Sequence, residues 1–144
     1  MKIDIKEITD GNKWVGKMVW ICDFRRPDLD KKPIRHVRPT NVLVRSNEEL
    51  PPKTRIYYSN NHFCKLNSKG EPTASGIIPV VDNTGYRMIS GTPVLVFDNE
   101  EECNEAYCIM ADAIIDQLDL KMSSVLLDLN KQKEDIIIDK SKYL

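Results

Sequence analysis

Hydrophobic and polar positions divide the chain into two parts with different periodicity. Up to Phe97 the apolar residues form short runs, rich in β-branched and aromatic side chains and separated by turn-forming residues, which is typical of β-strands. After Asp98 they recur every three or four residues, the spacing of one face of an α-helix. The pattern therefore predicts a β-rich N-terminal part followed by a helical C-terminal part.

Five or six short strands are predicted in the N-terminal part. The two longest are Trp14–Phe24 and Ile34–Arg45, and in the second Pro39 cannot donate a ladder hydrogen bond, which indicates an edge, a bulge or a bend. Asn67–Gly76 has the composition of an exposed loop. Turn-forming residues separate the shorter predicted strands, which include 55–59, 62–66, 77–81 and 94–97. Strands of this spacing favour an antiparallel sheet or a partly closed barrel.

The helical part begins with a capping pattern at Asp98. Its carboxylate is spaced to accept the amide hydrogen of Glu101, and the acidic run Glu100–Glu102 suits the positive end of a helix dipole. The pattern predicts one helix, or two with a break inside Asp119–Ser124, where consecutive serines favour local side-chain hydrogen bonds. The predicted fold is α+β in a single domain. It consists of a β-rich part (1–97), one or two amphipathic helices (98–134) and a tail (135–144).

The apolar stripe of the helical part is wider than a small sheet needs. Seven of its residues alternate spacings of three and four, as in a coiled-coil seam: Cys108, Ala111, Ile115, Leu118, Met122, Val125 and Leu129. One interpretation is a helix packed entirely on its own sheet. The other is a homodimer or higher homo-oligomer, in which part of the stripe contacts a second copy. The spacing alone favours neither interpretation.

Charge divides the chain at the same boundary as periodicity. Up to Phe97 there are 16 Lys or Arg against 10 Asp or Glu, a net charge of +6, and from Asp98 onward there are 5 against 12, a net charge of −7. This polarity suits an anionic ligand on the N-terminal part, or an acidic helix lying on the basic part of another subunit. Two ordinary solvated faces would carry the same charges equally well.

Membrane, secretion, metal and catalytic signatures are all missing from the sequence. No stretch approaches the roughly 20 apolar residues that cross a bilayer, and Met1–Glu7 alternates charged with apolar residues where a signal peptide runs apolar. Cys22, Cys64, Cys103 and Cys108 form no CxxC pair and lie in or beside apolar runs, as buried free thiols do in a reducing compartment. Nucleophile-elbow, phosphate-loop, dinucleotide and HExxH motifs are absent. We expect a non-catalytic cytoplasmic binding protein without metal, cofactor or membrane attachment.

The residues best suited to a ligand are arginines, aromatic residues and one glycine-containing loop, 82–87. Arginine makes paired hydrogen bonds to phosphate, and aromatic rings stack on nucleotide bases, although core packing is the commoner role of any single ring. Arg35 and Arg45 would share a sheet face if no bulge intervened, with Arg38 on the other face. The candidate ligand-binding residues are Arg35, Arg38, Tyr58, Phe63, Asn83, Thr84, Tyr86 and Arg87.

Four segments carry a further signal: Tyr57–Ser59, Lys69–Pro72, Asp82–Arg87 and Val96–Cys103. Together with a β-rich part followed by helices, they resemble the small phage proteins that defeat Thoeris immunity by sequestering its cyclic ADP-ribose-type signal. The resemblance implies a sponge, an oligomer often built on dimers, that binds a phosphate-bearing nucleotide signal tightly without cleaving it. It would use arginine, aromatic and amide contacts, and it would act in the host cytoplasm if a phage encodes it.

Two functions of other classes stay open. The first is inhibition of a partner protein through the acidic helical part, for example by imitation of nucleic acid, which the net charge of −7 favours. The second is RNA or DNA binding through the basic, aromatic-containing strands. An isoelectric point near 6.1 counts against the second function.

Overall fold

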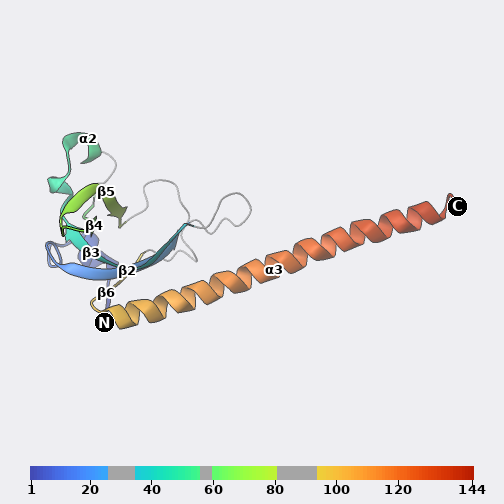
Figure 1. The fold of residues 1–144 in the computed structure, drawn as a ribbon, viewed down its shortest axis with the longest axis horizontal. Coiled ribbons are helices and arrows are strands. Elements are labelled where there is room, and N and C mark those ends of the chain that lie inside the picture. Colours follow the sequence, from blue (N-terminus) through green and yellow to red (C-terminus); the bar gives the residue numbers. More distant parts are fainter. Residues whose placement is uncertain (26–34, 56–59, 81–93) are drawn as a thin grey trace. The chain divides into compact units, whose positions relative to one another are not determined.

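The structure is a computed structural model that describes residues 1–25, 35–55, 60–80 and 94–144 (Figure 1). The chain divides into two compact units, Met1–Cys108 and Ile109–Leu144. The first unit, here called the body, contains a β-sheet and the first turns of a long helix. The second unit, here called the extension, holds the remaining turns of that helix.

Among the described residues of the body, six antiparallel strands form one open sheet, which confirms the predicted α+β fold in its open-sheet form. The spatial order is β1-β6-β2-β3-β4-β5, so β1 and β5 are the two edges. The strands are β1 (Lys2–Ile3), β2 (Met18–Arg25), β3 (Arg35–Arg45), β4 (His62–Leu66), β5 (Pro72–Pro79) and β6 (Leu95–Phe97). A 3-10 turn (Asn47–Glu49) and the short helix α2 (Pro52–Arg55) lie between β3 and β4 along the chain.

One face of the sheet carries the main hydrophobic core. Val19 of β2 pairs with Val42 of β3, and Phe63 of β4 pairs with Val44, so alternate positions of neighbouring strands put branched and aromatic side chains together. Each strand contributes to this cluster, and Ile8 of α1 (Ile5–Thr9) joins it. The cluster consists of Ile3, Ile8, Val19, Ile21, Val42, Val44, Phe63, Ile78, Val80, Val94 and Val96. Because a one-residue slip would turn these side chains to the other face, the core fixes the strand register.

The first turns of the long helix α3 (Glu100–Ser141) supply contacts to other residues of β2. The ring of Phe24 stacks on Tyr107, with ring centroids 5.3 Å apart. Cys103 of this helix raises the pKa of the Cys22 thiol, and both thiols are buried. These residues alternate along β2 with the core residues, so β2 buries side chains on both of its faces.

The N-terminal elements β1 and α1 were not among the predicted elements. Both are very short, so neither gives a readable periodicity. β1 pairs with β6 through Ile3 and Val96, and Asp4 caps α1 by accepting a hydrogen bond from the amide of Lys6 at 3.0 Å. Pairing at the sheet edge and a side-chain cap therefore hold this segment in place, and neither interaction produces a periodic pattern in the sequence.

The predicted strands at β3, β4 and β6 are confirmed to within a residue. β2 begins at Met18 and not at Trp14, which lies in a preceding turn. There the indole nitrogen of Trp14 donates a hydrogen bond to the Glu7 carboxylate at 2.9 Å. Trp14, which was predicted to lie in the strand, is therefore held in the turn by the hydrogen bond of its indole N–H group.

The predicted loop Asn67–Gly76 is wrong from Pro72 onward, where β5 begins. The side-chain oxygen of Asn67 accepts hydrogen bonds from the amides of Lys69 and Glu71, each at 2.9 Å, and Gly70 has a φ of 77°. These features make a tight turn that returns the chain beside β4. Polar composition predicted a long loop because composition does not show at which residue the turn ends and the next strand begins.

α3 begins one residue later than the Asp98 cap predicts. The side-chain oxygen of Asn99 accepts the amide hydrogen of Glu102 at 2.9 Å, so Asn99 is the capping residue. The Asp98 carboxylate instead accepts a hydrogen bond from the Asn99 amide group at 2.9 Å and pairs with the N-terminal ammonium of Met1. That pairing lowers the pKa of Asp98 and raises the pKa of the N-terminus.

α3 then runs without a break to Ser141, which confirms the interpretation of one helix over that of two, whereas the predicted end at 134 is wrong. The physical reason is that the sequence contains no glycine or proline after Pro93. Two consecutive serines lower helix propensity only slightly and do not remove a backbone hydrogen bond. The predicted tail, including Ile136–Ile138, is therefore mostly helical.

The extension exposes many large apolar side chains. Leu120 is 73% exposed and Leu127 is 70% exposed, and valine, methionine and isoleucine residues along the same helix are exposed as well. Within the described parts of the chain, no helix is both long enough and apolar enough to cross a membrane. Charged residues recur throughout the extension between its apolar positions.

Candidate functional site

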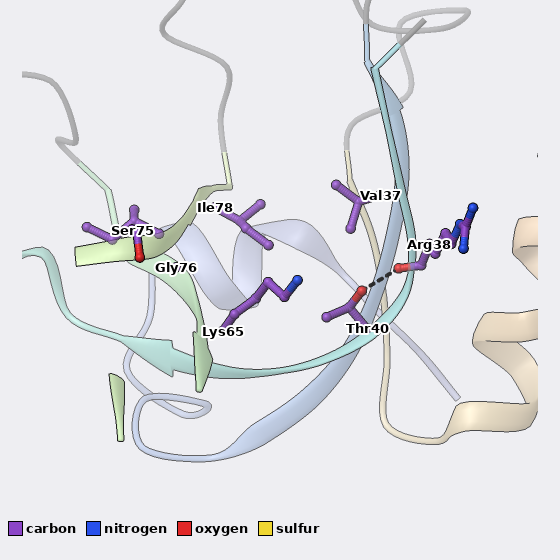
Figure 2. A pocket seen from close by; sticks show the side chains of 8 residues that line it. Val37, Arg38, Thr40, Lys65, Ser75, Gly76 and Ile78 are labelled. Carbon is purple, nitrogen blue, oxygen red and sulfur yellow. Dashed lines mark hydrogen bonds between the residues drawn. The ribbon is translucent and has the colours of Figure 1, made fainter. Parts of the chain in front are cut away.

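A cavity of about 520 Å³ lies in the body, among β3, β4 and β5 (Figure 2). Ligand pockets in proteins commonly enclose roughly 300 to 1,000 Å³. The described residues that line this cavity are Val37, Arg38, Thr40, Lys65, Ser75, Gly76, Ile77 and Ile78. The lining combines apolar, hydroxyl and cationic groups, which is the composition of a site for a small amphipathic ligand.

The β3 side of the cavity is shaped by a bulge at Pro39. Ile21 of β2 pairs with Thr40, and Asp23 pairs with Val37, so two residues of β3 lie opposite one residue of β2. The bulge predicted as one outcome of Pro39 is thus confirmed. Val37 and Thr40, three positions apart, both point toward the cavity, whereas the side chain of Arg38 leaves the strand on its other side (Figure 2).

The β5 side is shaped by a larger irregularity. Cys64 pairs with Ile77 and Leu66 pairs with Pro72, so the four residues 73–76 of β5 lie opposite Lys65 alone. Gly76 is buried there, and a Cβ atom on it would lie 2.6 Å from the carbonyl oxygen of Lys65. Only glycine fits so close an approach of two strands.

Lys65 provides the cation of the cavity. Its side chain extends from β4 into the space between Ile78 and Thr40 (Figure 2). The hydroxyl of Thr40 donates a hydrogen bond to the carbonyl oxygen of Arg38 at 2.5 Å, which leaves its oxygen lone pairs available as acceptors. On the β5 side, the hydroxyls of Ser75 and Thr73 lie 3.3 Å apart. An ammonium group with nearby hydroxyls is suited to a phosphate or carboxylate group.

The structure distributes the predicted site residues unevenly. Arg38 lines the cavity, although its guanidinium points away. Phe63 is 0% exposed in the core and presents no ring face to a ligand. Arg35 belongs to β3, but its side chain lies outside the described part of the structure. The remaining candidates lie outside the described residues: Tyr58, Asn83, Thr84, Tyr86 and Arg87.

The condition on the arginine spacing along β3 is not met. Arg35 and Arg45 were expected to share a sheet face only if no bulge intervened, and a bulge does intervene. Arg45 instead pairs with Glu49, with its Nε atom 2.8 Å from the carboxylate. Arg45 therefore belongs to a local ion pair, and it does not line the cavity.

Sequence reasoning missed Lys65, Ser75 and Gly76 as site residues. The signal for Lys65 was a charged residue within the apolar strand 62–66, which marks a strand face that is not fully buried. The signal for Gly76 was a lone glycine before an apolar run, which marks a bulge or a close backbone approach. Neither signal says which strand lies opposite, so neither locates a cavity.

Two other reactive groups of the body lie outside the cavity lining. His62 is 0% exposed, and neither ring nitrogen has a hydrogen-bond partner among the described residues. Burial together with the Arg45 charge lowers the pKa of His62. The hydrogen bond to Cys103 and burial raise the pKa of the Cys22 thiol, which keeps it protonated at neutral pH. Across the described residues, no group of three or more potential ligands is placed to hold a metal ion.

No protein-family model, curated protein or solved structure matches this chain. The features of this chain that bear on function are the cavity of the body and the exposed apolar and charged residues of the extension.

Proposed function

We propose that this protein is a non-catalytic binding protein that holds a small phosphate-bearing ligand intact in the cavity among β3, β4 and β5. The observation that carries the proposal is the direction of Lys65, whose ammonium group enters a cavity of about 520 Å³ (Figure 2). The ligand class that fits best is a cyclic nucleotide. The protein would then act as a sponge that lowers the free concentration of such a signal.

The chemistry of the lining supports this ligand class. The Lys65 ammonium is a compact charge with three donors that suits a phosphate group, and the hydroxyls of Thr40 and Ser75 supply directional hydrogen bonds. Val37, Ile77 and Ile78 offer apolar contact for a base or ribose. A nucleotide carries both kinds of group, whereas inorganic phosphate would leave the apolar wall unused.

Long-range charge supports the same class. The chain up to Phe97 has a net charge of +6, which attracts anions and raises their rate of association. In the described part of the lining there is one ammonium group and no carboxylate, imidazole or thiol, a set that favours holding a ligand over proton transfer. Together with the resemblance to the anti-Thoeris proteins of phages, this favours a counter-defence sponge for a cyclic ADP-ribose-type signal.

Isothermal titration calorimetry with a matched pair of variants tests the proposal. Both lysines are exposed, but Lys65→Ala removes a charge that lines the cavity, and Lys69→Ala removes a charge from the turn before β5, outside the lining. Loss of a charge-assisted contact costs about 1.5 to 3 kcal/mol, so Lys65→Ala should weaken binding roughly tenfold to a hundredfold. Lys69→Ala should bind like the wild type, and both variants should keep the melting temperature of the free protein.

The ligands to be titrated are cyclic ADP-ribose isomers and cyclic di- and trinucleotides. Chromatography of the released ligand should return it unchanged. Absence of heat with all of these ligands would overturn the proposal, and an altered ligand would move the protein to the enzymes. Arg87→Ala, together with Asn83→Ala, tests whether the loop 82–87 completes the site. If these two variants weaken binding and Lys65→Ala does not, the ligand lies at the loop and not in this cavity.

A second candidate function is inhibition of a partner protein through the acidic helix. The observation that favours it is the row of exposed apolar side chains in the extension, which includes Leu120 and Leu127. Native mass spectrometry of protein purified from its own host separates the two functions. A retained nucleotide favours the sponge, and a retained foreign protein favours the inhibitor.

A further inference from the structure

The extension exposes a continuous seam of apolar residues at heptad spacing. Ile115, Met122, Leu129 and Ile136 are seven residues apart, and Leu118 and Val125 lie three residues after the first two. All six side chains are exposed, from 37% at Leu118 to 68% at Met122. In heptad notation, where a and d mark the seam, the first four occupy position a and the other two occupy position d. A helix in water keeps such a seam only where another surface covers it.

We propose that α3, along its seam from Ile115 to Ile136, pairs with the same segment of a second copy as a parallel, two-stranded coiled coil. Side chains at a and d would then insert between side chains of the other helix. The helix is unbroken over these residues, so the seam stays continuous from Ile115 to Ile136. The proposal concerns assembly only, and it does not depend on any ligand of the body.

Charges beside the seam match a second copy in this arrangement. In a parallel pair, a residue at position g of one helix lies near the e residue five positions later in the other helix. Asp128 at g then meets Lys133 of the second copy, and Asp135 meets Lys140. By two-fold symmetry each pair occurs twice. Charged residues at e and g also favour two strands, because larger bundles bury those positions.

The direction of the two helices follows from Gln132, the polar residue at the next d position. In a parallel pair Gln132 faces Gln132 of the second copy, and the two amides can hydrogen-bond to each other. An antiparallel pair with the same seam also brings opposite charges together, such as Asp112 and Lys133. It places Gln132 against Ile115, however, and leaves a buried amide without a partner. Gln132 therefore selects the parallel arrangement.

Light scattering after size-exclusion chromatography, with two variants of opposite helix faces, tests the assembly. Met122→Glu with Leu129→Glu places charges in the seam, whereas Leu120→Glu with Leu127→Glu places the same charges at position f, on the opposite face. The wild type and the position-f variant should have twice the chain mass of 16.6 kDa, and the seam variant should have the chain mass. Far-UV circular dichroism confirms that each variant remains folded.

Three outcomes of that experiment would overturn the proposal. The first is a monomeric wild type at micromolar concentration. The second is dissociation of the position-f variant to the same extent as the seam variant, which would mean that the seam is not the contact. The third is a wild-type mass of three or four chains, which would replace the two-stranded arrangement by a larger bundle.

Disulfide cross-linking tests the direction. In a Cys108→Ser background, which removes the exposed native thiol, Leu129→Cys should form a disulfide-linked dimer on oxidation because parallel helices bring the two sulfur atoms together. An antiparallel pair places position 129 beside position 118 of the other copy. Cross-linking only in the double variant Leu118→Cys with Leu129→Cys would therefore contradict the parallel arrangement. Neither readout uses a ligand, so failure here and failure of the sponge proposal are separate results.

Discussion

The body and the extension place their apolar residues in opposite environments. In the body, Val19, Val42 and Phe63 are 0% exposed, whereas in the extension Leu120 is 73% exposed. A strand must pair with other strands to satisfy its backbone hydrogen bonds, and pairing brings apolar faces from distant parts of the sequence together. A helix makes its backbone hydrogen bonds within itself, so a helix can form while its side chains pack against no other element. The body thus buries its apolar residues in a core of its own, whereas the extension leaves many of its apolar residues exposed, and we propose that a second copy covers them.

The same difference separates the proposed ligand binding, which uses the body, from the proposed assembly, which uses the extension. The cavity is built by strand irregularities inside a packed sheet, at Pro39 and at Gly76, and such positions are held rigidly by their neighbours. The coiled-coil seam repeats along one helix, and the helix itself places the seam residues on one face without any tertiary contact. Ligand binding and assembly can therefore be removed one at a time.

The largest expected effect comes from a matched pair of truncations, one in each unit. Phe63→Ala removes a fully buried ring and should lower the free energy of unfolding by about 3 to 5 kcal/mol. Leu127→Ala removes an exposed side chain at position f and should change it by less than about 0.5 kcal/mol. Urea titration measures both, with tryptophan fluorescence as the signal of the body, to which Trp14 and Trp20 belong, and far-UV circular dichroism as the signal of the helical extension. Equal shifts in the two variants would break the comparison.

Much of the fold was predictable because its signals are local. The runs that form β3 and β4 carry β-branched and aromatic residues, and the helix starts within two residues of Asp98 because acidic and amide side chains gather there. Of the two interpretations left open, one helix is confirmed over two with a break inside Asp119–Ser124, because local hydrogen bonding of serine is weaker than an uninterrupted helix.

The candidate site was less predictable because it depends on contacts between strands. Phe63 looked like a stacking ring, but its pairing with Val44 turns it into the core. Arg38 looked like a phosphate ligand, but the bulge at Pro39 turns its side chain away from the cavity. Lys65 and Gly76 form the site only because the irregular part of β5 lies beside Lys65. Sequence patterns identify which residue types are present, whereas register decides where they point.

The second prediction sharpens the comparison through pH, because His62 belongs to the body alone. Burial, assisted by the charge of Arg45, lowers the pKa of His62 in the folded state. An unfolded histidine binds a proton below its ordinary pKa of about 6.5, so the unfolded state binds more protons than the folded state as the pH falls below that value. The free energy of unfolding should therefore decrease on acidification, with a slope of up to about 1.4 kcal/mol per pH unit.

Fluorescence-detected urea titrations at pH 7.5 and pH 5.5 measure this dependence. His62→Leu should flatten the slope, because the group that takes up the proton on unfolding is gone. His36→Leu removes the other histidine of the chain and should keep the slope. If the slope disappears with His36→Leu and persists with His62→Leu, the buried histidine does not control the acid response of the body.

The smallest expected effect lies near the junction of the two units, at the helix cap. Asn99→Ala removes the hydrogen bond that its side chain accepts from the amide of Glu102, and loss of such a cap costs about 1 kcal/mol. Asn104→Ala is the matched control, because it makes the same change at an exposed position inside the helix, where alanine has the higher helix propensity. Asn99→Ser should retain most of the stability, since serine also caps helices. Because the first turns of α3 belong to the body, the loss should appear in the fluorescence-detected transition. A loss confined to the helical signal would instead mean that these turns unfold with the extension.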